Sequence, residues 1–310
     1  MTPPPAPSDA VAIELNAVLV ALTANQPLVL TLEDGTLLPS GPFATEHPTL
    51  QSGLRAWVER QTNHPLGYVE QLYTFADRNR PGSDGRQRVV SISYLGLTRE
   101  RLSAGARDPE WRSWYRYFPW EDWRTGPAPL IAGTILPRLA PWVDAGADAG
   151  NRRERQQRVE VSFGDGRESW NEDLVLQRYE LLYEAGLVPE AKHPAADPVP
   201  GMPMRHDHRR ILATGIARLR AKIKYRPVFF ELMPPEFTLL QLQRAVEALA
   251  GRPMHKQNFR RLIDAQGLVE PTGASTAEAR GRPAKLFRFR REVVLERAVV
   301  GSKLPLSRPI

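Results

Sequence analysis

Residues 255–268, with the sequence HKQNFRRLIDAQGL, carry the side chains that proteins use to read base pairs. Phe259, Leu262 and Ile263 repeat at helical spacing, which predicts a helix over about 255–265 that turns them inward. The polar residues left largely on its other faces are Lys256, Gln257, Asn258, Arg260 and Arg261. Arginine and lysine bond guanine in the major groove, and asparagine and glutamine bond adenine. These residue types indicate a DNA-reading helix, although a solvated charged helix would carry the same types.

A basic loop and two further helices surround this segment. The loop, ARGRPAK, places three cations where they suit a narrow groove or phosphates: Arg280, Arg282 and Lys285. The alternating run KLFRFRR (285–291) after it predicts an exposed strand. Before it, residues 208–224 predict an amphipathic helix with a basic outer face, and Thr238 with Gln241 predicts a capping box at the start of another helix. Helix, helix, turn, helix, strand, basic loop and strand is the order of a winged helix-turn-helix.

The distribution of charge supports a nucleic-acid partner. The 310 residues carry a net charge of +7, but residues 203–310 hold 22 basic and 9 acidic residues, a net charge of +13. Residues 1–202 hold 20 basic and 26 acidic residues, a net charge of −6. The basic third therefore coincides with the predicted DNA-reading helix, which makes a merely solvated face the weaker interpretation.

Composition excludes several other classes of protein. With 42% hydrophobic and 25% charged residues the chain is an ordinary globular protein of about two domains. The absence of cysteine excludes disulfides, thiolate zinc sites and a cysteine nucleophile, and the six histidines show no metal-ligand spacing. No apolar run approaches the ~20 residues of a membrane helix, and the N-terminus lacks a signal peptide, so a cytoplasmic protein without membrane contact is expected.

The first two thirds of the chain predict a mixture of strands and helices. Strands are expected within 11–33, 68–76 and 88–98, and helices within 49–61 and 173–185. Residues 146–158 are expected to form an exposed loop before a short strand, VEVSF (159–163), and the proline-rich segment 193–204 is expected to be an extended linker. Seven aromatic residues crowd into 111–123. They could stack on a nucleobase, but packing in a core or a dimer interface is the favoured interpretation.

Residues 216–273 and GRPAKLFRF (281–289) resemble the Nudix-related transcriptional regulators of NAD metabolism, the NrtR family, and the aromatic segment is closest to its NadQ-type branch. The resemblance implies a degenerate Nudix-like α/β/α sandwich followed by a C-terminal winged helix-turn-helix. It implies a sensing and dimerisation domain over 1–192, with an insertion at about 100–190, and a DNA-binding domain over 205–310. It also implies a homodimer that binds double-stranded operator DNA and represses NAD biosynthesis genes.

The catalytic motif of Nudix hydrolases, G-x5-E-x7-R-E-U-x-E-E-x-G-U, is degenerate in this chain. Aligned on Gly41, the motif retains Arg55 and Glu59. The substituted positions are His47, Ala56 and Arg60 in place of glutamates, and Thr62 in place of glycine. A metal site for Mg²⁺ needs several hard oxygen ligands, and a single carboxylate beside a cation should bind Mg²⁺ poorly. We therefore predict no metal site, no catalytic residues and no pyrophosphohydrolase activity.

The resemblance implies that the degenerate domain senses a nucleotide. The effector is expected to be ADP-ribose, NAD or ATP, and no cofactor is required. Candidate ligand-binding residues are Arg55, Glu59 and Arg88, although Arg55 also fits a structural role and Glu59 an exposed salt-bridged helix face. Two other functions stay open: an active ADP-ribose-type pyrophosphohydrolase with an accessory basic domain, and a nonspecific nucleic-acid-binding protein.

Overall fold

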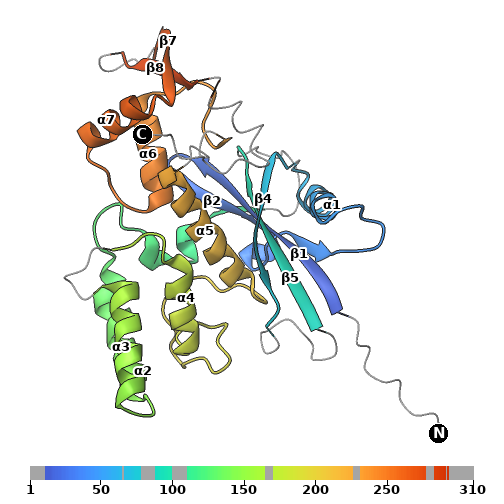
Figure 1. Ribbon diagram of the computed structural model, residues 1–310, viewed down its shortest axis with the longest axis vertical. Helices are drawn as coiled ribbons and strands as arrows, with labels where there is room; N and C mark the ends of the chain where they lie inside the picture. The colour runs from blue at the N-terminus through green and yellow to red at the C-terminus, as the bar shows by residue number, and fades with distance from the viewer. Residues whose placement is uncertain are drawn as a thin grey trace, which may run out of the picture.

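The computed structural model describes residues 11–64, 66–77, 88–99, 110–164, 170–225, 231–276, 283–290 and 292. A six-stranded sheet forms the N-terminal part, and helices with a two-stranded hairpin form the C-terminal part (Figure 1). The strands of the large sheet are β1 (Val11–Thr23), β2 (Gln26–Thr31), β3 (Ser40–Pro42), β4 (Tyr68–Phe75), β5 (Arg88–Leu97) and β6 (Glu110–Ser113). Their order is β4-β5-β1-β2-β6, and β3 pairs with the first half of β1.

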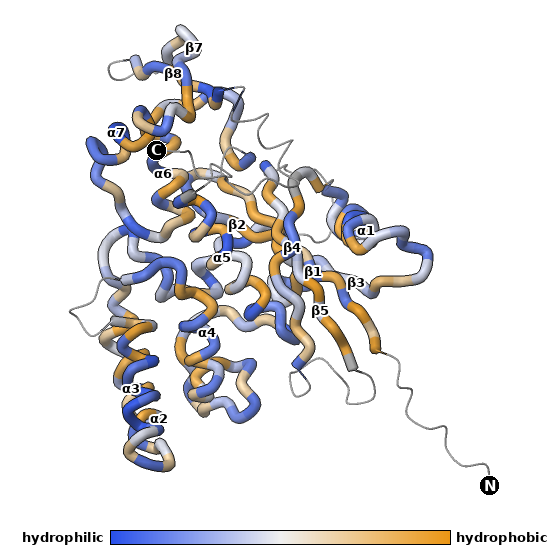
Figure 2. The backbone as a smooth tube through the Cα atoms, in the orientation of Figure 1, coloured by the Kyte–Doolittle hydropathy of each residue, from blue (hydrophilic) through white to orange (hydrophobic). Residues whose placement is uncertain are grey.

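The sheet is mixed, because β1 and β5 are parallel while the other pairs are antiparallel. The strands predicted within 11–33 are β1 and β2, which form a hairpin. In its turn Ala24 and Asn25 take positive φ angles of 48° and 60°, as a tight two-residue turn requires. The strands predicted within 68–76 and 88–98 are confirmed as β4 and β5. Hydrophobic residues extend along the strands labelled β1 and β5 in Figure 2.

The two faces of the sheet carry different layers. Alternate residues of β1 point to opposite faces, so Leu15 and Leu19 join one buried cluster while Val18 and Val20 join the other. α1 (Leu50–Thr62) covers the first face with Leu54 and Val58. α5 (His208–Tyr225) lies on the second face, where it contacts β1, β4 and β5 (Figure 1). The predicted α/β/α sandwich is therefore confirmed.

Residues 114–204, which we call the helical insert, lie between β6 and α5. Its elements are the short helices η2 (Trp114–Arg116), η3 (Pro119–Glu121) and η4 (Ile131–Ile135), followed by α2 (Leu136–Asp144), α3 (Ala149–Phe163) and α4 (Val175–Glu184). The α4 helix was predicted, and Gly186 follows it with a φ of 73°. α2 and α3 form a hairpin at the end of the molecule away from β7 and β8 (Figure 1).

The strand predicted at 159–163 and most of the loop predicted at 146–158 were wrong, because residues 149–163 form α3. Asp148 caps this helix by accepting a hydrogen bond from the Asn151 amide at 2.8 Å. The Arg, Gln and Glu residues that resembled a loop are strong helix formers on its exposed face, which is hydrophilic in Figure 2. Val159 and Phe163 lie one helical turn apart and are both buried, so tertiary packing outweighs the strand propensity of this run.

α5 differs from its prediction in one respect. Ile211, Leu212 and Ile216 are buried as predicted. However, the expected basic outer face is interrupted, because Arg209 and Arg220 are fully buried and bind partners in the helical insert. Arg209 pairs with Glu190 at 3.2 Å among aromatic rings. α5 therefore packs against the sheet and the helical insert together.

The proline-rich segment 193–204 contains no helix or strand, as predicted. It nevertheless packs against the rest of the molecule. Val199 and Met204 are buried, and the Val199 amide donates to the Leu187 carbonyl at 2.8 Å. No helix in the described ranges is long and apolar enough to cross a membrane.

His208, the first residue of α5, is a buried neutral base. Its Nδ1 accepts a hydrogen bond from the Leu38 amide at 2.8 Å, and its ring lies 5.7 Å from that of His206. Burial, reinforced by the charge of His206, lowers the pKa of His208 to about 3. The histidine is therefore neutral in the folded protein at neutral pH.

We expect this histidine to make stability depend on pH. Because its folded pKa is depressed, the stabilisation is complete above pH 6.5 and is lost as the pH falls toward 3. Between pH 7.5 and pH 5 this group should lower the free energy of unfolding by about 2 kcal/mol. His208→Asn, which keeps an acceptor for the Leu38 amide, should flatten this slope in urea unfolding at both pH values. The exposed His255→Asn is the control and should retain the wild-type slope, and a wild-type slope in His208→Asn would contradict the assignment.

Candidate nucleic-acid interface and nucleotide site

The C-terminal helices α6 and α7 begin where the sequence predicted. α6 (Leu239–Ala250) starts at Thr238, whose hydroxyl accepts from the Gln241 amide at 3.1 Å while Gln241 Oε1 accepts from the Thr238 amide at 2.7 Å. α6 ends at Gly251, with a φ of 76°, and α7 (Lys256–Gln266) ends at Gly267, with a φ of 59°. His255 is the N-cap residue of α7. The predicted capping box is confirmed, and each helix ends at a glycine in the left-handed region.

α7 has one buried side and one exposed side. Phe259 and Ile263 are buried against α6 and the hairpin, whereas Leu262 was wrongly predicted to face inward and is 53% exposed. All five predicted base-reading residues are exposed on this helix: Lys256, Gln257, Asn258, Arg260 and Arg261. Asn258 Oδ1 accepts a hydrogen bond from Arg261 Nη2 at 2.7 Å. α7 thus presents lysine, glutamine, asparagine and arginine side chains to solvent.

A hairpin of β7 (Val269–Ser275) and β8 (Lys285–Phe289) completes this part of the fold. Phe287 of β8 pairs with Phe237 just before α6, and the rings of Phe237 and Phe289 lie 4.7 Å apart. Lys285 is exposed at the start of β8. The structure places the hairpin beside α7 (Figure 1), whereas Arg280 and Arg282 lie outside the described residues.

The degenerate Nudix motif lies on and before α1. A Cβ on Gly41 would lie 2.2 Å from Cδ2 of Trp57, so the strand passes the ring too closely for any side chain there. Arg60 stacks on Trp57 with its guanidinium 4.6 Å from the ring centroid. His47 Nδ1 accepts a hydrogen bond from the Ala44 amide at 3.1 Å. No group of three potential metal ligands occurs among the described residues.

The structure describes the side chains of two of the three candidate ligand-binding residues. Arg55 donates to the carbonyl of Leu66 and, at 3.0 Å, to that of Gly67, so it holds the loop before β4. Glu59 lies one turn further along α1 and is exposed. Arg88 begins β5, where its backbone pairs with Val11, but its side chain lies outside the described residues. The structure thus places Arg55 and Glu59 on one helix and leaves the contribution of Arg88 a prediction.

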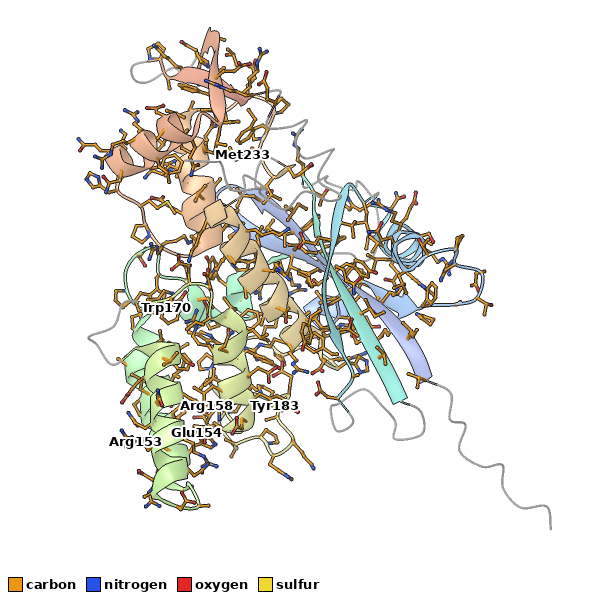
Figure 3. All side chains as sticks on the ribbon, in the orientation of Figure 1. Arg153, Glu154, Arg158, Trp170, Tyr183 and Met233 are labelled. Atoms are coloured by element: carbon orange, nitrogen blue, oxygen red, sulfur yellow. The ribbon has the colours of Figure 1, made fainter. Side chains whose placement is uncertain are left out.

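The aromatic residues of 111–123 mostly fill the core. Trp114, Tyr117, Phe118 and Trp120 are fully buried. Packing, rather than an open platform for a nucleobase, is therefore the correct interpretation of these four rings. Trp123 stacks on Trp170 with ring centroids 4.2 Å apart, and Figure 3 shows Trp170 where the helical insert meets α5 and α6.

A buried ionic network that sequence analysis missed joins the helical insert to α5. Glu121 of η3 accepts from Nε of Arg178 in α4 at 2.6 Å and from Nη1 of Arg220 in α5 at 2.6 Å. None of the three side chains is exposed to solvent. Arg178 also lies 3.7 Å from the centroid of the Trp170 ring. Charges of opposite sign 57 and 99 residues apart carry no sequence signal that identifies them as partners.

The architecture defines a class of protein: an α/β/α sandwich that lacks a recognisable metal centre among its described residues and is followed by a winged helix. Residues 229–289 match the family model of the NrtR DNA-binding winged helix domain. The C-terminal part of the chain is therefore a winged helix of the NrtR type.

Comparisons with other proteins extend this result. The chain is similar to the ADPR responsive transcriptional repressor NtrR of Acinetobacter baylyi, with 41% identity over 83 residues, or 27% of this chain. The match spans about a third of the length of that relative, 33%. Among solved structures, Shewanella oneidensis NrtR complexed with a 27mer DNA is 21% identical, covers 91% of this chain and 95% of its own, and has a TM-score of 0.53. A MutT/nudix family protein from Enterococcus faecalis is 15% identical over 91% and 89%, with a TM-score of 0.52. These likenesses show a Nudix-like fold joined to a winged helix.

Proposed function

We propose that this protein is a transcriptional repressor of genes of NAD biosynthesis and metabolism, whose DNA affinity responds to an NAD-related nucleotide. The observation that carries the proposal is the exposed face of α7 within a winged helix of the NrtR type. The relative that shares 41% identity over 83 residues is itself described as an ADPR responsive transcriptional repressor. ADP-ribose is therefore the first effector to test, ahead of NAD and ATP.

DNA recognition is assigned to two surfaces. Lys256, Gln257, Arg260 and Arg261 would meet base edges and nearby phosphates from α7, because recognition helices enter the major groove with their N-terminal part. Asn258 would contribute its amide nitrogen, since its oxygen accepts from Arg261. Lys285, together with Arg280 and Arg282, would contact the backbone or minor groove from the hairpin. A homodimer would place two such helices on the half-sites of a palindromic operator.

The sandwich is assigned the role of a sensor without catalysis. His47, Ala56 and Arg60 replace the metal-binding glutamates of the Nudix motif, and no cofactor is required for binding. Arg55, Glu59 and Arg88 are the proposed ligand contacts, with Arg55 limited to the donors that the loop carbonyls leave free. The nucleotide would act by preferring one arrangement of the dimer and so shifting its population. The relation to the NadQ-type branch belongs to the same proposal. So does the division of the chain at 193–204, except that α5, which follows this segment, packs on the sheet of the sandwich.

Gel shifts on the DNA upstream of the protein's own gene test this function. At matched salt, binding to that DNA should be at least about 1,000-fold tighter than to a scrambled sequence. ADP-ribose should shift this affinity more than NAD or ATP does. In parallel, ADP-ribose incubated with the protein and Mg²⁺ or Mn²⁺ should yield no AMP above background. A specificity ratio near one would favour a nonspecific nucleic-acid-binding protein, and clear AMP release would favour the pyrophosphohydrolase.

A further inference from the structure

We infer that the helical insert positions the winged helix through the C-terminal end of α6, with Tyr115 and Arg220 as the positioning residues. This inference deepens the proposed function and rests on it. We call the contact the α6 joint and define it as Tyr115, Glu121, Trp123 and Arg220 together with residues 248–251.

Three hydrogen bonds bind the last turn of α6. The Tyr115 hydroxyl donates to the Ala248 carbonyl at 2.6 Å, and Arg220 Nε donates to the Leu249 carbonyl at 3.0 Å. The Trp123 amide donates to the Gly251 carbonyl at 2.6 Å. Carbonyls at the end of a helix lack partners within the helix, so they need donors from elsewhere when they are buried. Here the helical insert and α5 supply those donors.

The joint is closely packed as well as hydrogen-bonded. A Cβ on Gly251 would lie 2.4 Å from the Glu121 carbonyl oxygen and 2.6 Å from Arg220 Nη2. Arg220 is itself fixed by Glu121, whose carboxylate and carbonyl it binds at 2.6 and 3.2 Å. Burial raises the pKa of the Tyr115 hydroxyl, so this group stays protonated and keeps its donor role. The contact therefore holds α6 in one orientation.

The rim of the joint carries a second set of contacts. Glu172, just before α4, pairs with Lys224 at 3.0 Å and with Arg252 at 3.4 Å. Arg252 lies in the turn between α6 and α7, so the ion pair reaches the chain that leads into the recognition helix. These partly exposed pairs contribute less than the buried bonds, but they connect the same two parts of the molecule.

A fixed α6 determines where α7 points, because only five residues separate the two helices. In a dimer, rigid joints would hold two recognition helices at the spacing of an operator before DNA arrives. Such preorganisation favours binding to a complete operator but adds nothing to binding of one half-site. A ligand that moves the sandwich would then move both recognition helices without bending a linker.

Tyr115→Phe removes one bond of the joint and leaves the ring in place. Tyr117→Phe is the matched control. The buried hydroxyl of Tyr117 donates to the Gly35 carbonyl at 2.8 Å, away from the α6 joint. The native chain has no cysteine, so Gln156→Cys on α3 and Ala265→Cys on α7 allow two spin labels at exposed sites. Pulsed electron paramagnetic resonance, with labelled chains diluted in unlabelled protein, then reports the distance across the joint.

We expect a single narrow distance distribution in the labelled parent and in Tyr117→Phe, and a broader one in Tyr115→Phe. Tyr115→Phe should also bind the complete operator roughly tenfold more weakly, while its binding to an isolated half-site stays unchanged. Equal distributions in the two tyrosine variants would overturn the inference, as would equal losses on the complete operator and the half-site. If neither the labelled parent nor any variant binds operator DNA, the proposed function is contradicted. The distance measurement still decides whether the α6 joint is rigid.

Discussion

Glu121→Gln is expected to lower the free energy of unfolding by about 3–5 kcal/mol, although the new side chain has almost the same size. The carboxylate of Glu121 binds two guanidinium groups, and all three side chains are sealed from solvent. A neutral amide leaves Arg178 and Arg220 as two buried positive charges without the counter-charge that they share. Urea unfolding followed by circular dichroism measures the change.

Glu270→Gln is the matched control for this prediction. Glu270 pairs with Arg288 at 2.7 Å on the exposed hairpin, so losing this charge should cost no more than about 1 kcal/mol. A cost for Glu121→Gln as small as that of the control would mean that water reaches the network. Replacing Glu121, Arg178 and Arg220 together by apolar residues of similar volume should recover only part of the lost stability, because the Ser162 and Leu249 carbonyls then lose their donors.

Gln257→Ala is expected to relax the sequence preference of DNA binding more than it weakens DNA binding in general. The residue is exposed near the start of α7, where a bidentate contact to adenine would be formed. Losing such a contact should cost roughly 1–3 kcal/mol on the operator and nothing on random DNA. Titrations at one salt concentration against operators varied one base pair at a time would show which step loses its preference.

Lys285→Ala provides the comparison for the base-reading variant. This exposed residue lies on the hairpin, and its expected partner is a phosphate. The variant should weaken operator and random DNA alike and should reduce the slope of log affinity against log salt by about 1. Equal losses on operator and random DNA for Gln257→Ala would place the base-reading residues elsewhere.

Short-range sequence patterns were sufficient to predict most of the winged helix and the strands of the sandwich. Thr238 with Gln241 is a helix-start signal that acts over a few residues, and it lies where it was predicted. Gly251 and Gly267 end their helices by the same kind of local preference. The β1–β2 hairpin follows from two β-branched runs around Ala24 and Asn25. Short-range preferences of this kind survive folding because the tertiary contacts agree with them.

Most of the structure of the helical insert could not be predicted from short-range sequence patterns. Its stability depends on pairs such as Glu121 with Arg220, which are far apart in the chain and look like ordinary surface charges. Tyr115 gave no sign that its hydroxyl binds a helix terminus 133 residues away. One signal was available: Ile131, Ile135, Leu139 and Val143 repeat every four residues and are all buried, which is the pattern of a helix facing the core.

Because α5 packs against both the sheet and the helical insert, few positions in the chain are suitable for joining this protein to segments of a relative. Consider a chimaera in which everything after residues 193–204 comes from a relative. Its α5 would lack the acidic partners that Arg209, Arg210 and Arg220 bind in the native helical insert. A junction placed after Tyr225 would keep those pairs and transfer α6 and α7 alone, yet the donor helix would then need carbonyls that fit Tyr115 and Arg220. A functional chimaera should therefore require that the sandwich with its helical insert and the winged helix come from the same relative.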